Sequence, residues 1–290
     1  MIFHKTSWTV HGSTALFVLL WSSGAIFSEL GLEHASPFAF LVLRFGLAFS
    51  LLLTLALRRH RWLPAPGSRA RAAATGLVLI GSYPICYLLA LEHGVTPGVL
   101  ATVLGVQPIL TLALLERHYS IRRLLGLGLS MGGLVLVVYQ SLRIAHFPPS
   151  GMLFSLAALL CMTGGSILQK GVRQAPMDVL PLQYLVALLL CLAFVPFRPF
   201  DVDFSTGFLI ALIWLGILIS VVAQCLFYRL IQAGNLVNVT SLFYLVPIVT
   251  AIMDYLVLGN RLSPLSLAGM GAIVLGLMLV FRSQAGSRHH

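Results

Sequence analysis

The sequence predicts an all-α integral membrane protein with ten transmembrane helices, arranged as two inverted five-helix repeats. Composition is the first reason: 59% of the residues are hydrophobic, 9% are charged, and the mean hydropathy is +0.97. Soluble domains carry about a quarter charged residues, so these values indicate a chain that lies in lipid. The other two reasons are the length of the apolar runs and a pattern of proline, serine and glycine that occurs twice.

The apolar runs have the length that a bilayer requires. A helix needs about 20 mostly apolar residues to cross the hydrocarbon core. Connections between the runs are short and leave no room for a soluble catalytic domain. The first run follows Lys5 but is too long for a signal peptide and lacks a cleavage pattern, so we expect an uncleaved helix. The ten runs are residues 12–32, 37–57, 72–92, 97–116, 122–140, 150–170, 179–198, 206–228, 236–258 and 263–282.

The repeated pattern lies within residues 94–133 and again within 234–276. In each copy a proline interrupts an apolar run, and a serine and two glycines follow at intervals of six and then seven residues. The residues are Pro108, Ser120, Gly126 and Gly133 in one copy, and Pro247, Ser263, Gly269 and Gly276 in the other. We therefore expect two five-helix units, 1–145 and 146–290. An odd number of helices per unit inverts the second unit in the membrane.

Basic residues are concentrated on alternate connections, which predicts the orientation. Arg and Lys accumulate on cytoplasmic loops. With the N-terminus inside, both termini are predicted to be cytoplasmic, and the net charge of +10 reflects topology and not a nucleic-acid partner. The basic residues on the cytoplasmic side are then Lys5, Arg58, Arg59, Arg61, Arg69, Arg71, Arg117, Arg122, Arg123, Lys170, Arg173, Arg229, Arg282 and Arg288.

The first two runs carry Trp21 in mid-span, and Glu29 and Arg44 toward their outer ends. Trp is enriched at membrane interfaces, so Trp21 indicates a cavity or a helix contact. Arg44 lies about two turns inside the membrane, where a charge must reach water or pair. It either pairs with a glutamate of the outer side (Glu29, Glu33 or Glu92) or contacts substrate. Glu29 and Arg44 are candidates for coupling or gating.

The third and fourth runs each contain a proline, Pro84 and Pro108. Proline lacks an amide N–H and frees the carbonyl four residues earlier. Freed backbone groups in lipid are tolerated where they line a cavity, and carriers build substrate sites from such breaks. The polar side chains beside these breaks, which we expect to bind substrate, are Tyr83, Tyr87 and Gln107.

The fifth and tenth runs are almost free of polar atoms and carry small residues at helical spacing. Gly128 and Gly132 have the small-x-x-x-small pattern that allows close helix packing, and Ala268, Ala272 and Gly276 repeat it. These runs are predicted to pack together, either within one chain or across a homodimer. Monomer and homodimer both stay open.

The second half repeats the polar pattern of the first. Residues 159–169 align with 19–29 at an offset of 140. Pro247 breaks the ninth run as Pro108 breaks the fourth, and Asp254 is an intramembrane carboxylate that serves either coupling or a structural hydrogen bond. The further residues expected to bind substrate are Tyr184, Gln224, Tyr228, Asn238, Ser241 and Tyr244.

The chemistry of these residues favours a neutral or zwitterionic organic solute. Aromatic rings, Trp21 among them, stack on apolar side chains or cations, and the amides supply hydrogen bonds. A phosphorylated metabolite would need paired basic groups in mid-membrane, and only Arg44 lies there, which disfavours a sugar-phosphate or nucleotide-sugar antiporter. The four cysteines lie in apolar runs without CxxC spacing, so neither a metal nor a disulfide is indicated. No cofactor is expected, and no Walker A sequence is present.

Several of these features together resemble the drug/metabolite transporter superfamily, in its ten-helix EamA-like branch. They are the sequence LWSSG at 20–24, the lone Arg44 before FGLA, the prolines of the fourth and ninth runs, and GNRLS at 259–263 followed by AGMG. The resemblance covers essentially the whole chain and implies a bacterial inner-membrane exporter of amino acids or related metabolites, similar to aromatic amino-acid and methyl viologen exporters. This chain departs from the family at Asn260, where a glutamate is usual, and Glu116 lies about a turn early.

The sequence disfavours two other classes of membrane protein, a lipid-modifying enzyme and an ion channel. A lipid-modifying membrane enzyme would need a catalytic cluster at the interface, and the sequence has no HExxH, no paired acidic motif and no group of histidines. An ion channel would need a repeated filter or a charge ring. We therefore expect a secondary carrier and no enzyme, with the substrate and the bilayer as its partners.

Overall fold

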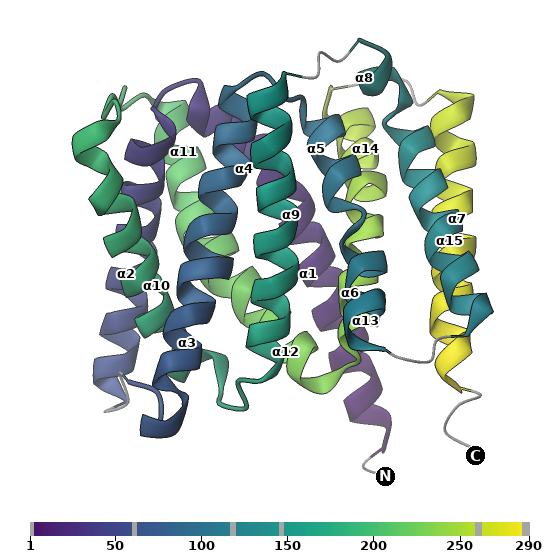
Figure 1. The fold of residues 1–290 in the computed structure, drawn as a ribbon, viewed down its shortest axis with the longest axis horizontal. Helices are drawn as coiled ribbons and strands as arrows, with labels where there is room; N and C mark the ends of the chain where they lie inside the picture. The colour runs from purple at the N-terminus through teal and green to yellow at the C-terminus, as the bar shows by residue number, and fades with distance from the viewer. Residues whose placement is uncertain (1–2, 60–62, 117–119, 145–147, 259–262, 286–290) are drawn as a thin grey trace.

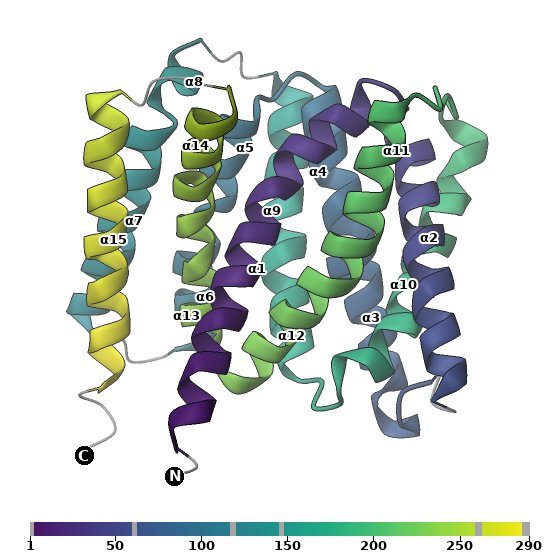
Figure 2. The same ribbon diagram turned by 180° about the vertical axis from the view of Figure 1, so that it is seen from behind.

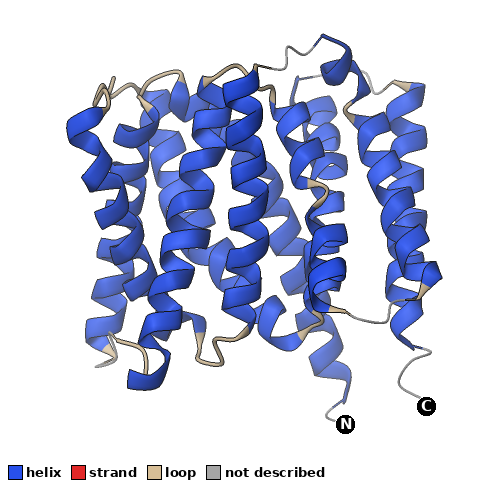
Figure 3. Cartoon of the chain, in the orientation of Figure 1, coloured by secondary structure: helices blue, strands red, loops and turns tan. Residues whose placement is uncertain are grey.

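The computed structural model describes residues 3–59, 63–116, 120–144, 148–258 and 263–285. This part of the chain folds into helices that run roughly parallel or antiparallel across one slab (Figures 1, 2 and 3). The β-type pairing in it is a single isolated bridge between Ala35 and Val202. The expected all-α class is confirmed for the described residues.

The α-helices are α1 Phe3–Leu32, α2 Pro37–Arg58, α3 Arg69–Thr75, α4 Tyr83–Glu92, α5 Pro97–Leu104, α6 Gln107–Leu115, α7 Ile121–Val137, α8 Tyr139–Ile144, α9 Pro149–Lys170, α10 Pro176–Phe194, α11 Thr206–Ile213, α12 Gln224–Ala233, α13 Leu236–Ser241, α14 Leu245–Leu258 and α15 Pro264–Ala285. Five further helical segments adjoin them, three of them 3₁₀-helices (η1, η3 and η5) and two of them π-helices (η2 and η4). These are η1 Pro66–Ser68, η2 Gly76–Ser82, η3 Val195–Phe197, η4 Trp214–Ala223 and η5 Leu242–Tyr244.

Within the described ranges, nine stretches are long and apolar enough to cross a membrane. They correspond to nine of the ten predicted runs. The remaining run, 122–140, forms α7, which has 17 residues, and the start of α8. Both views show α7 beside α15 over most of its length (Figures 1 and 2).

The two ends of the bundle differ in charge. Helix α1 begins and α15 ends at the same end, called here the terminal end (Figure 1). Basic side chains gather at this end, because α2, α9 and α15 finish there and α3 and α7 begin there. The opposite end, called here the acidic end, carries most of the acidic side chains. These are Glu29, Glu33, Glu92, Asp201 and Asp203.

Helices α7 and α15 pack through glycines, so the predicted seam lies within one chain. A Cβ atom on Gly126 would lie 2.7 Å from the Gly276 carbonyl oxygen, and one on Gly133 would lie 2.6 Å from that of Gly269. Only glycine fits at such a crossing. Gly128, in contrast, has open space around it, as does Gly132. The small-x-x-x-small pattern of 128–132 therefore lies off the seam, which uses glycines seven residues apart.

Three apolar clusters hold the helices together, the smallest of them around Val95 and Leu100. The largest one joins α1, α2, α4, α9, α10 and α12 through side chains such as Phe45 and Phe227. The second one lies between α6, α7, α13 and α15 and includes Leu134 and Ile273. The pair α7 and α15 thus meets the rest of the bundle mainly through the interrupted helices.

Two helices contain a π-helical stretch. Segment η2 lies just before Pro84, and the Tyr83 amide donates to the Val78 carbonyl, five residues back. The wider turn accommodates the proline, which can neither donate to the Ile80 carbonyl nor pack against it closely. Segment η4 has no proline after it, so nothing in the sequence predicted its wider turns.

Candidate functional site

Two interrupted helices meet in the middle of the bundle. The first breaks at Gly105 between α5 and α6, just before Pro108, and the second changes to a 3₁₀ turn at η5, just before Pro247. Each proline lies in the first turn after its break, where its missing amide costs little. The Tyr244 hydroxyl donates to the Gly105 carbonyl oxygen at 2.7 Å, so one freed carbonyl is satisfied by the other broken helix.

Arg44 lies on α2 among side chains from three other helical segments. Its Nε donates to the Ser220 hydroxyl of η4 at 3.0 Å, and the Tyr184 hydroxyl of α10 donates to the Ser220 carbonyl at 2.6 Å. The guanidinium also interacts electrostatically with Tyr83 and Tyr87 of α4. Because these neighbours surround it, the space that Arg44 faces is internal to the bundle.

No carboxylate pairs with Arg44 among the residues that the structure describes. The predicted alternative, an ion pair with Glu29, Glu33 or Glu92, is therefore not found. Its terminal nitrogens have no protein hydrogen bond in the described part of the chain. They are left free to bind something else.

Tyr83 and Tyr87 border the same space. Their rings pack edge to face with centroids 6.0 Å apart. Both side chains are half-buried, and neither hydroxyl has a partner in the described ranges. The guanidinium and the two phenols thus form one group of interacting polar side chains.

A cavity of about 1040 Å³ opens at the acidic end. It is lined by the end of α1, the start of α2, residues 91–97 and residues 201–203. Glu29 lies in its wall, and Tyr87 of α4 interacts electrostatically with Glu29. Asp203 of the rim pairs with His34 at 3.4 Å.

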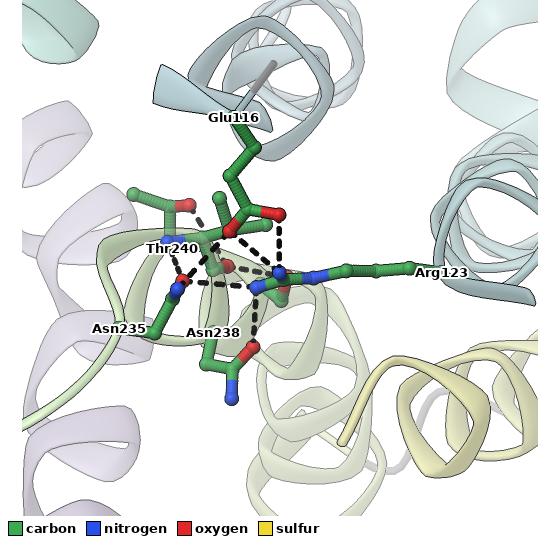
Figure 4. Close-up of polar contacts among 7 residues, drawn as sticks. Glu116, Arg123, Asn235, Asn238 and Thr240 are labelled. Carbon is green, nitrogen blue, oxygen red and sulfur yellow. Dashed lines mark hydrogen bonds and ion pairs between the residues drawn. The ribbon is translucent and has the colours of Figure 1, made fainter. Parts of the chain in front are cut away.

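A cluster of four polar side chains, called here the terminal-end cluster, lies at the terminal end (Figure 4); its members are Glu116, Arg123, Asn235 and Asn238. Arg123 Nη1 lies 2.6 Å from both Glu116 carboxylate oxygens, and Nη2 donates to both asparagine side chains at 2.9 Å. Asn235 returns a hydrogen bond to Glu116 at 3.0 Å and caps α13. Arg123 is 5% exposed, so the guanidinium at the centre of the cluster is buried.

A second polar chain lies between α9, α10 and α12. The Tyr228 hydroxyl donates to Gln183 at 2.7 Å, and Gln183 donates to Gln169 at 3.0 Å. All three side chains are buried, and Gln169 Nε2 and Gln224 Nε2 have no partner. This chain ties the second half together near the terminal end.

The predicted substrate-binding residues fall into several places. Tyr83, Tyr87 and Tyr184 lie around Arg44, and Gln224 and Tyr228 belong to the buried amide chain. Gln107 donates to Ser166 at 3.4 Å, and Asn238 joins the terminal-end cluster. Ser241 donates to the Val237 carbonyl of its own helix. Trp21 packs in an aromatic cluster with Phe17, Phe227 and Phe243. The side chain of Asp254 lies outside the described part.

Sequence reasoning missed several polar residues. Ser220 and Gln183 were single polar residues in apolar runs, and Arg123 was counted only as a cytoplasmic charge. The signal was present in principle, because buried polar groups in lipid require partners. In the described residues no group of His, Cys, Asp or Glu has metal-ligand geometry.

Taken together, the long apolar helices define a multi-pass helical membrane protein. The chain belongs to the EamA-like transporter family, whose sequence profile matches residues 12–139 and 149–282. The resemblance to the drug/metabolite transporter superfamily is confirmed, and membership of this family indicates a transporter and not an enzyme.

Relatives and a solved structure agree with this assignment. A Salmonella typhimurium protein named as a probable amino-acid metabolite efflux pump is 25% identical over 293 residues, which cover 91% of this chain and 92% of the relative. An Archaeoglobus fulgidus protein described as an uncharacterized transporter is 27% identical, covering 87% and 90%. A crystal structure superimposes with a TM-score of 0.78 at 18% identity, covering 93% of this chain and 96% of the other, which shows the shared fold.

Proposed function

We propose that this protein is a secondary carrier that exports amino acids or related neutral or zwitterionic metabolites across the bacterial inner membrane by alternating access. One observation carries the proposal: a cavity of about 1040 Å³ opens at the acidic end, whereas the partners of the buried Arg123 join several helices at the terminal end. A conformation open to one side is what alternating access requires.

The proposal includes two inverted units, 1–145 and 146–290, with α7 as the tenth span. The family profile matches twice, once in each unit. The glycine seam supports the same division, because Gly126 and Gly133 occupy the places in the first unit that Gly269 and Gly276 occupy in the second. If the two units exchange places, Gly126 takes the position of Gly269, and Gly276 takes the position of Gly133. The contact between Gly126 and Gly276 then becomes the contact between Gly269 and Gly133, and both contacts exist.

The same equivalence relates the open and closed ends. Thr96 caps α5 and Asn235 caps α13. These two caps are 139 residues apart, which is also the interval between Pro108 and Pro247. Thr96 lines the open cavity, whereas Asn235 lies in the terminal-end cluster. Opening the terminal end would therefore require Asn235 to leave Arg123 and Glu116.

Charge gives the proposed direction. Because basic residues favour the cytoplasmic side, the terminal end and both chain termini are assigned to the cytoplasm. The cavity then faces the outside, and substrate enters from the cytoplasm after the terminal-end cluster separates. The name of the Salmonella relative supports amino-acid metabolites as the substrate class and export as the direction.

Solute counterflow tests this function. Purified protein is reconstituted into proteoliposomes preloaded with unlabelled Phe, Met, Thr or Leu, and uptake of the labelled compound is followed with and without a pH gradient. We expect saturable accumulation of at least one amino acid above empty liposomes. Absence of counterflow for all four, beside an active control carrier, would contradict amino-acid transport. An effect of the gradient would indicate proton coupling.

A further inference from the structure

We infer that Arg44, with Tyr83 and Tyr87, binds the carboxylate of the transported solute and that Glu29 receives its ammonium group. This inference rests on the proposed function and names its substrate class: molecules that carry a free carboxylate and a free amine together. It replaces a role in coupling or gating for Glu29 and Arg44 with direct recognition.

The unpaired charge of Arg44 is the first argument. A guanidinium inside the hydrocarbon region is costly unless it meets water, a counter-ion or a polar ligand. Here Nε bonds to Ser220 and the guanidinium lies over the Phe45 ring at 5.8 Å, but the described part of the chain supplies no carboxylate and no hydrogen bond to the terminal nitrogens. Two parallel N–H groups of arginine match the two oxygens of a carboxylate.

The phenols complete a binding surface of matching chemistry. Tyr83 and Tyr87 interact electrostatically with Arg44, and their hydroxyls have no hydrogen-bond partner in the described ranges. A phenol O–H can donate to a carboxylate oxygen, whereas the guanidinium of Arg44 has no acceptor atom to offer it. Tyr184, in contrast, is 2% exposed with its hydroxyl already bonded, so it supports the site without being free to bind.

Glu29 supplies the opposite charge at a suitable depth. At about 1.5 Å per helical residue, Glu29 lies roughly one turn from the end of α1, and Arg44 lies roughly two turns from the start of α2 at the same end of the bundle. Tyr87 interacts with both of them. A solute in this space would thus meet an acidic group toward the cavity and a basic group beneath it.

This arrangement predicts discrimination by functional group. A methyl ester or a decarboxylated amine leaves Arg44 unpaired, and an N-acetylated compound leaves Glu29 unpaired. A site built to bond a group rejects analogues that lack it, because its own polar atoms stay unsatisfied. The side chain of the solute contributes little to this selection.

The test measures binding by thermal stabilisation of purified protein. The probes are L-phenylalanine, its methyl ester, phenethylamine and N-acetyl-L-phenylalanine, with the corresponding leucine set run in parallel. For the unmodified protein we expect half-maximal stabilisation at a concentration at least about tenfold lower for the free amino acid than for each analogue. In Arg44→Gln the preference over the ester and the amine should disappear, and in Glu29→Gln the preference over the N-acetyl compound should disappear.

Matched variants control for general damage. Arg198→Gln removes an exposed arginine at the acidic end that is absent from the cavity wall, and Asp178→Asn removes a carboxylate from α10 at the terminal end. Both should keep the full preference. Should Arg44→Gln fail to fold, Tyr83→Phe and Tyr87→Phe keep the charge and should each weaken amino-acid binding about threefold, while Tyr139→Phe, on exposed α8, should not.

Equal stabilisation by phenylalanine and its ester in the unmodified protein, or a retained preference in Arg44→Gln, would overturn the inference. Counterflow with the same preparations separates this result from failure of the transport proposal. The predicted binding pattern without counterflow would overturn the function and leave the assignment of Arg44 standing. Counterflow without this binding pattern would overturn the assignment of Arg44 and leave the transport function standing.

Discussion

Tyr244 donates its hydroxyl to the carbonyl of Gly105 at 2.7 Å, and these two positions are separated by 139 residues, as are Pro108 and Pro247. Gly105 and Tyr244 are therefore equivalent positions of the two units. Equivalent positions can touch only where the two units meet. If the units are related by a two-fold axis, that axis passes close to this hydrogen bond. The bond therefore joins the two breaks at the centre of the bundle.

Replacing Tyr244 by Phe tests what this bond contributes. The Gly105 carbonyl would lose its partner in a buried position, since Tyr244 is 1% exposed. An unsatisfied buried carbonyl costs about 1–3 kcal/mol. We expect a lower midpoint of thermal unfolding in detergent and altered counterflow, whereas Tyr139→Phe should leave both unchanged. An unaltered midpoint for Tyr244→Phe would show that the bond contributes nothing.

Neighbouring glycines of α7 should respond differently to the same change. Gly133→Ala places a methyl group 2.6 Å from a backbone carbonyl that cannot move aside alone. Overpacking of this kind costs about 1–3 kcal/mol. Gly132→Ala has open space around it and should be neutral or stabilising by about 0.5–1 kcal/mol. Thermal unfolding of the two variants compares them directly, and equal midpoints would contradict the seam.

The terminal-end cluster should control access from that end. Glu116→Gln removes the carboxylate from Arg123, and loss of a charge-assisted hydrogen bond costs about 1.5–3 kcal/mol. Thr240→Cys, on buried α13 above the cluster, reports opening in a variant without native cysteines. We expect an impermeant maleimide in inside-out vesicles to label it about tenfold faster in Glu116→Gln.

The exposed neighbour Arg122 provides the control for this experiment. Arg122→Gln should leave the labelling rate unchanged, because Arg122 makes no side-chain contact with the cluster among the described residues. Exchanging the charges, in Glu116→Arg with Arg123→Glu, should slow labelling again. No acceleration in Glu116→Gln would mean that the cluster does not hold this end closed.

Orientation in the membrane is open to a direct test. Ala70→Cys, exposed on α3, lies at the terminal end, and Thr206→Cys, exposed at the start of α11, lies at the acidic end. If basic residues face the cytoplasm, an impermeant maleimide added to intact cells should label Thr206→Cys and spare Ala70→Cys until the cells are opened. The opposite pattern would reverse the proposed direction of transport.

Sequence reasoning located the apolar spans and the interruptions well, because both have strong local causes. A run of about 20 apolar residues reports lipid directly, and proline acts on its own helix, as at Pro108 and η5 before Pro247. The π-helical η4 has no such local cause.

Long-range partners were the main gap. Arg123 and Asn235 are 112 residues apart, and each looked like an ordinary loop residue. The Gly128 and Gly132 pair drew attention to the wrong side of α7, whereas the seven-residue interval of the repeat already marked Gly126 and Gly133. Arg44 was recognised as unusual, but its lack of an acidic partner became visible only in the fold.

The glycine seam also has a mechanical consequence. Helices that touch backbone to backbone at two levels, at Gly126 and Gly133, cannot slide or rotate past one another without a clash. The pair α7 and α15 is thus suited to stay rigid during transport, while the interrupted helices beside it move. Arg123, in the first turn of α7, would then stay in place, and the moving helices would contact it in only one of the two conformations.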